Sequence, residues 1–199
     1  MIELQIYFTR AARNGYLALL TKLLPSTLQE MGSELLRKVL DYVAQAGDGD
    51  LAMKIINCKP ESISQTTLDR ACEGGCLPLV RYLIEERQID PTQPSWLISG
   101  MIRWPYDYAT LKGHIHVMRY LHSKEGGDGG QTREWGKKPL FYAAKKGHLE
   151  IVKMLVEERR HDINVREVVD WGNPKKSPLE VAVTHCRLGV ARFEFSHSL

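Results

Sequence analysis

Residues 138–156 read K-P-L-F-Y-A-A-K-K-G-H-L-E-I-V-K-M-L-V, and this stretch decides the fold of the chain. Pro139 suits the first turn of a helix, because its missing N–H would have no partner there anyway. Gly147 is typical of the position just past a helix end, where the backbone turns left-handed. An apolar stripe at helical spacing lies on each side of this glycine. The stretch therefore predicts a helix, a tight turn and a second, antiparallel helix. The two stripes are formed by Leu140, Ala143, Ala144, Ile151, Val152 and Leu155.

The same frame recurs along the chain as a turn residue followed by apolar residues four, five and eight positions later, of which the last copy keeps only the first two, Val190 and Ala191. Six copies are present, and their turn positions lie 28 to 39 residues apart. A period in this range indicates a repeat protein. One helix pair alone would leave an apolar face exposed, and stacking the next pair covers it. The six turn positions are Gly15, Gly47, Gly75, Gly113, Gly147 and Cys186.

These residues resemble the ankyrin repeat, whose pattern is T-P-L-H-x-A-A-x-x-G-H-x-x-V-V-x-x-L. Residues 138–155 are similar to it at most fixed positions, and residues 66–83, 104–121 and 177–191 look like weaker copies. The resemblance implies an all-α fold, an ankyrin-repeat solenoid of about six helix–turn–helix repeats with irregular or hairpin-like connecting loops. We expect a single domain over residues 1–199, with approximate repeats 3–30, 34–61, 62–99, 100–133, 134–172 and 173–199.

The chain departs from the family pattern at the histidine of T-P-L-H, which no copy retains. In ankyrin repeats that histidine hydrogen-bonds neighbouring loops, so the resemblance implies looser order between repeats here. The connection over residues 161–176 is long, and Ile163 and Val165 could pair with Val168 and Val169 as a short β-hairpin. The residues at the histidine position are Thr9, Asp41, Asp69, Asp107, Phe141 and Glu180.

Composition and motifs argue against several functional classes. No apolar run of the 199 residues approaches the roughly 20 residues that cross a bilayer. The N-terminus has no basic region of the signal-peptide type, so we expect a cytoplasmic or nuclear protein without a membrane partner.

The four cysteines show no disulfide framework, and Cys72 occupies a small-residue position of its repeat, which favours packing over metal binding. The glycine-rich run at residues 126–130 lacks the Lys-Ser/Thr of a phosphate loop, and serine-hydrolase and zinc-protease motifs are missing. We therefore expect no enzyme activity, no cofactor, no metal and no small-molecule substrate.

The ankyrin resemblance implies protein–protein interaction through the concave face and the loop tips. Residues 1–99 carry a net charge of −2 and residues 100–199 a net charge of +5, so the C-terminal half would attract an acidic segment of a partner. A pI of about 8.6 is too weakly basic to favour nucleic acid. We expect a monomer that binds another protein. The alternative is a targeting or regulatory adaptor arm of a larger assembly, such as a ubiquitin ligase or an enzyme complex.

Candidate contact residues fall into three groups, each with a plainer interpretation. The first is a basic stripe over the last three repeats, which could equally be a solvated face with screened charges. The second is a column of tyrosines before the small residues, which could instead pack between helices. The third consists of tryptophans near the loops, which could instead cover the ends of the core. The candidates are Arg103, Lys112, Lys137, Lys145, Lys146 and Lys176 in the stripe, Tyr108 and Tyr142 in the column, and Trp135 and Trp171 near the loops.

Overall fold

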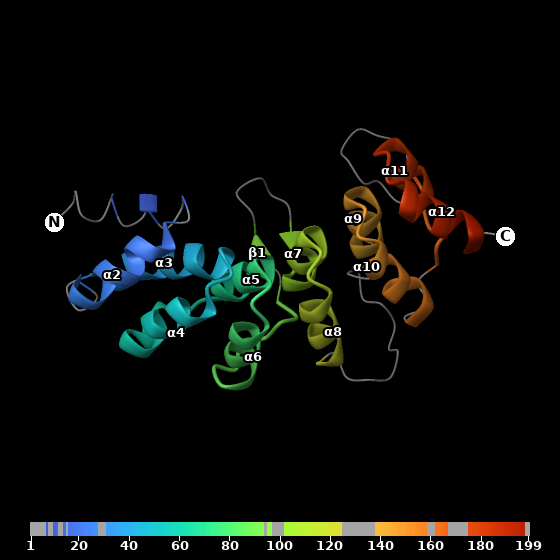
Figure 1. The fold of residues 1–199 in the computed structure, drawn as a ribbon. Helices are drawn as coiled ribbons and strands as arrows, with labels where there is room; N and C mark the ends of the chain where they lie inside the picture. Colours follow the sequence, from blue (N-terminus) through green and yellow to red (C-terminus); the bar gives the residue numbers. More distant parts are fainter. Residues whose placement is uncertain are drawn as a thin grey trace. The chain divides into compact units, whose positions relative to one another are not determined.

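The computed structural model of the chain is drawn as a ribbon in Figure 1. By its internal contacts the chain divides into two compact units. Unit 1 comprises Met1–Tyr108 and unit 2 comprises Ala109–Leu199, so the boundary lies inside one helix. Each unit is described by itself. The structure describes residues 7, 10–11, 14, 16–27, 31–93, 95–96, 102–124, 138–158, 162–166 and 175–197.

Unit 1 is built from antiparallel helix pairs that stack side by side. The first helices of neighbouring pairs, α3 and α5, pack on each other, and so do the second helices, α4 and α6. A short antiparallel hairpin follows, in which Ser95 pairs with Arg103 and Trp96 with Ile102. The elements are α2 (Leu17–Thr27), α3 (Ser33–Gln45), α4 (Gly49–Cys58), the 3₁₀ turn η1 (Pro60–Ser62), α5 (Gln65–Gly74), α6 (Leu77–Glu85), β1 (Ser95–Trp96) and β2 (Ile102–Arg103).

Unit 2 repeats this arrangement. Helix α9 packs on α11 of the next pair, and α12 packs on both α11 and α10. The outer helix of the middle pair continues from α10 into a π-helical turn, η2. The elements are α7 (Pro105–Lys112), which begins in unit 1, then α8 (Ile115–Ser123), α9 (Lys138–Lys146), α10 (Leu149–Lys153), η2 (Met154–Glu158), α11 (Pro178–Thr184) and α12 (Leu188–His197).

The predicted all-α helix–turn–helix repeat is confirmed within each unit. Five helix pairs, from α3–α4 to α11–α12, follow one another in the described part of the chain. Glycines 47, 75, 113 and 147 all adopt positive φ, between 74° and 84°, as the turn requires. Cys186 adopts a φ of 56° at the same place in the last pair. A side chain in this conformation costs about 1–2 kcal/mol, so the last turn is strained.

The apolar residues that follow each turn form the core. In the pairs after Gly47, Gly75, Gly113 and Gly147, all three predicted residues are buried. The first copy differs, because Leu19 is 49% exposed while its neighbour Leu20 is fully buried. The predicted triplet is therefore wrong at Leu19, where the described part of the helix turns this position to solvent.

Hydrogen bonds connect neighbouring repeats where the sequence led us to expect looser order. Asp41, at one of the missing histidine positions, accepts hydrogen bonds from Thr66 Oγ1 at 2.9 Å and from Thr67 Oγ1 at 2.8 Å. Both threonines belong to the next repeat, at the start of α5. An aspartate that accepts from the following repeat thus replaces a histidine at this junction. In unit 2 the outer helices are also joined, because Arg119 forms a bidentate ion pair with Glu158 at 2.6 and 2.9 Å.

One connecting segment forms a hairpin, which is one of the two kinds of connection that the sequence led us to expect. It consists of β1 and β2 and lies in the connection before α7. The hairpin predicted over residues 161–176 involves Val168 and Val169, which lie outside the described residues, as does the glycine-rich run at 126–130. None of the described helices combines the length and apolar character that a membrane span requires.

Candidate functional site

Three consecutive turns of unit 2 lie against one another and carry most of the described basic candidates. Nε2 of His148 lies 3.2 Å from the carbonyl oxygen of Leu111, which belongs to the preceding turn. In the same way, Arg187 Nε donates a hydrogen bond of 3.1 Å to the carbonyl oxygen of Lys145. The residue after each turn position therefore reaches back to the turn before it, and this contact fixes the register of α7, α9 and α11.

The lysines on these turns hold equivalent positions in neighbouring repeats. Lys112 and Lys146 each come directly before a left-handed glycine, and both are exposed. Lys145 is half-buried. Cations in the last turn of a helix also offset the partial negative charge of its carbonyl end, so these lysines stabilise α7 and α9 as well.

The remaining basic candidates lie at the other end of the inner helices. Lys176 is half-buried and precedes Ser177, the N-cap of α11. Arg103 likewise precedes α7 and ends β2. A helix of seven residues, such as α11, is about 10 Å long, so Lys176 is separated from the row of turns by that length. Within unit 2, Lys176 therefore does not cluster with the lysines on the turns.

Tyr108 is only 4% exposed and is engaged inside unit 1. The guanidinium carbons of Arg70 and Arg103 lie 5.9 and 5.8 Å from the centre of its ring, within the range of cation–π contacts. Arg70 also forms an ion pair with Glu73 at 2.7 Å. Burial raises the pKa of the Tyr108 hydroxyl. The packing interpretation therefore describes Tyr108, whereas Tyr142 is half-buried and keeps part of its surface.

The three remaining candidates, Trp135, Lys137 and Trp171, lie outside the described residues.

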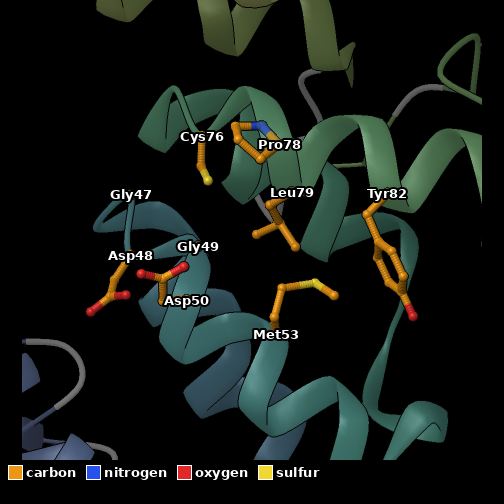
Figure 2. A pocket seen from close by; sticks show the side chains of 9 residues that line it. All are labelled: Gly47, Asp48, Gly49, Asp50, Met53, Cys76, Pro78, Leu79 and Tyr82. Atoms are coloured by element: carbon orange, nitrogen blue, oxygen red, sulfur yellow. The ribbon is translucent and has the colours of Figure 1, made fainter.

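Sequence reasoning missed an open groove in unit 1, between the outer helices α4 and α6 (Figure 2). Its volume is about 540 Å³. Asp48 and Asp50 lie at one end and Tyr82 at the other, with Met53 and Leu79 pointing toward each other between them. The signal in the sequence was the run Asp48-Gly49-Asp50, which places two carboxylates at the start of α4 directly after the turn glycine.

The described part of the chain does not gather ligands for a metal. No group of three or more His, Cys, Asp or Glu side chains within it could hold an ion. The four cysteines are free thiols. Cys72 is buried in α5, as its small-residue position predicted, and burial raises the pKa of its thiol. A buried thiol with a raised pKa is a packing group and a poor nucleophile.

Comparison with known proteins bears on the C-terminal part of the chain. Residues 107–193 match the family model described as ankyrin repeats, with three copies. The matched segment contains helices α8 to α11, most of α7 and the first part of α12. No curated protein matches the chain.

Proposed function

Because residues 107–193 match ankyrin repeats, which are generally protein–protein interaction modules, we propose that the chain binds an acidic segment of a partner protein through unit 2. The observation that carries this proposal is the row of stacked turns with exposed Lys112 and Lys146 and half-buried Lys145. Ankyrin repeats are typically non-enzymatic, and we propose that this chain acts by binding alone.

The exposed lysines contribute mainly to the rate and selectivity of association. A single exposed ion pair is worth about 0–1 kcal/mol, so two or three lysines do not hold a partner by charge alone. They do attract a negatively charged segment and orient its approach. The half-buried ring of Tyr142, on the same helix as Lys145, offers apolar contact area beside them. We assign affinity chiefly to such contacts and steering to the lysines.

Other residues extend the proposed contact beyond the turns. Lys176 lies at the start of the inner helix α11, where a partner that follows the family's concave face would meet it. Arg103, in unit 1, stays a proposed contact on the basis of sequence alone. Lys137, Trp135 and Trp171 remain proposed contacts at the loop tips on the basis of sequence alone. Two of the four thiols, Cys58 and Cys186, are exposed and unpaired, which fits a reducing compartment. We therefore propose a cytoplasmic or nuclear site of action.

The test compares two charge-reversed variants of the full chain. Lys145→Glu with Lys146→Glu removes the proposed steering charge, and Lys22→Glu with Lys54→Glu makes the same change in net charge at exposed positions of unit 1. Binding of a fluorescent glutamate-rich peptide is measured by anisotropy at 50 and 300 mM salt. We expect the first variant to bind at least fivefold more weakly at low salt, and the control to change less than twofold. Equal effects of both variants would show that only net charge matters and would contradict the proposal.

A further inference from the structure

The groove between α4 and α6 has the opposite charge to the basic turns of unit 2. Its lining contains two carboxylates, Asp48 and Asp50, and none of the lysine, arginine or histidine residues that the structure describes. The N-terminus of α4 contributes only about half a positive charge, so the two carboxylates outweigh it. An acidic segment is therefore repelled here, and the groove requires an occupant different from the one proposed for unit 2.

The two carboxylates are placed differently. Asp48 is the N-cap of α4, and its Oδ1 accepts a hydrogen bond of 3.0 Å from the backbone N–H of Leu51, which leaves Oδ2 for other contacts. Asp50 lies in the first turn of the same helix and is exposed. Neither forms an ion pair within the described residues. Two separate carboxylates suit a compact cation with several donors better than a planar guanidinium that binds one carboxylate through both oxygens.

The rest of the groove is apolar. Leu79 is buried at its floor, Met53 is half-buried opposite it, and the ring of Tyr82 closes the far end (Figure 2). A volume of about 540 Å³ lies within the range of protein sites that hold a small ligand or several side chains. The flexible Met53 can adjust its shape to an occupant. A lysine places its methylene stem on such a surface and its ammonium at the polar edge.

We propose that this groove binds a lysine side chain of a partner peptide, together with an adjacent aliphatic residue. The ammonium contacts Asp48 and Asp50, its stem lies along Met53, and the aliphatic neighbour packs toward Leu79 and Tyr82. The charge complementarity and the apolar floor together select this occupant over an acidic or a purely apolar segment. The chain then has two recognition surfaces of opposite charge, one in each unit.

The test uses the ¹⁵N-labelled full chain and three capped hexapeptides that differ at one position between leucines: lysine, glutamine or glutamate. Amide shifts are followed by NMR as each peptide is added. We expect saturable shifts in residues 47–53 and 76–82 with the lysine peptide, at least fivefold weaker binding with glutamine, and none with glutamate. Equal binding of the lysine and glutamine peptides, or shifts confined to other residues, overturns the proposal.

Variants make the assignment specific to the groove. Asp48→Asn with Asp50→Asn removes both charges, and asparagine keeps the capping hydrogen bond of Asp48. This variant should bind the lysine peptide at least fivefold more weakly, whereas Glu34→Gln with Glu61→Gln, at exposed positions of the same unit, should bind it normally. Unchanged binding by the first pair overturns the proposal.

Met53→Lys supplies the cation from the chain itself and should abolish binding, which keeps the test decisive if the asparagine variant folds poorly. Self-association that vanishes in the asparagine variant would assign the groove to a second copy instead and overturn the peptide proposal.

Discussion

Gly74, the last residue of α5, offers the clearest test of how closely neighbouring repeats approach. A Cβ added to Gly74 would lie 2.1 Å from the carbonyl oxygen of Ala44 and 2.9 Å from both the carbonyl oxygen of Gln45 and the backbone nitrogen of Gly47. All three atoms belong to the backbone of the preceding repeat. Ordinary contact begins at 3.4 Å, so Gly74→Ala requires the two segments to separate by about 1.3 Å, the difference between 3.4 and 2.1 Å.

Two effects of Gly74→Ala oppose each other. Gly74 is helical, and alanine is favoured over glycine in a helix by about 1 kcal/mol. Overpacking typically costs about 1–3 kcal/mol, and the upper end applies here because no flexible side chain can move aside. We therefore expect Gly74→Ala to lower the free energy of unfolding by about 2 kcal/mol, measured by urea unfolding followed by far-UV circular dichroism.

Gly189→Ala is the matched control. Gly189 is also helical, in α12, but the nearest atom to its added Cβ is Leu149 Cδ2 at an ordinary 3.9 Å. This variant should gain up to about 1 kcal/mol through helix propensity alone. If Gly74→Ala proves as stable as the native chain while Gly189→Ala behaves as expected, the inferred close packing of α3 and α5 is wrong.

Three further predictions concern unit 2. Cys186→Gly should raise the free energy of unfolding by about 1 kcal/mol, because it relieves the φ of 56°; a lower urea midpoint would contradict this. Burial raises the pKa of Glu194 from 4.5 to about 8, so the free energy of unfolding should fall as the pH rises from 4.5 to 8. At pH 7 it should be about 3 kcal/mol lower than at acidic pH, where Glu194 is protonated in both the folded and the unfolded chain. Glu194→Gln should remove that pH dependence, and identical urea midpoints of the native chain at pH 5 and 8 would refute it. Arg187→Ala removes the hydrogen bond to the Lys145 carbonyl and should cost about 1 kcal/mol, with faster hydrogen exchange in the α9–α11 turns as its local signature; unchanged exchange there would count against the turn contact.

The fold could be predicted because the repeat signal is local and recurs at a fixed spacing. A turn such as Gly113 and the core residues Val117 and Met118 are set by helix geometry and by the tolerance of glycine for positive φ. Even Cys186 could be assigned as a turn residue from its position in the repeat pattern. The close contact at Gly74 could not, because it depends on the distance between two helices that only their combined packing determines.

The candidate site was predictable only in part for the same reason. Register along the repeat placed Lys112 and Lys146 at equivalent turns, and the structure brings those turns together. Register did not reveal that Tyr108 is engaged by Arg70 and Arg103, because those side chains come from different elements. The groove was missed because Asp48 is already explained locally as a helix cap. The sequence alone does not show that Asp48 also lines a groove against α6.

The backward reach of His148 and Arg187 bears on how such a chain can be recombined. A Cβ at Gly113 would lie 2.9 Å from the His148 ring, and one at Gly147 would lie 2.8 Å from Arg187 Cδ. Each glycine is thus matched to a side chain encoded more than 30 residues later, in the following repeat. Exchanging one repeat by cutting at the connecting loops separates these matched pairs. A graft that carries the turn glycine together with the next repeat's His or Arg preserves both partners, so the natural unit of exchange is offset from the unit of sequence similarity.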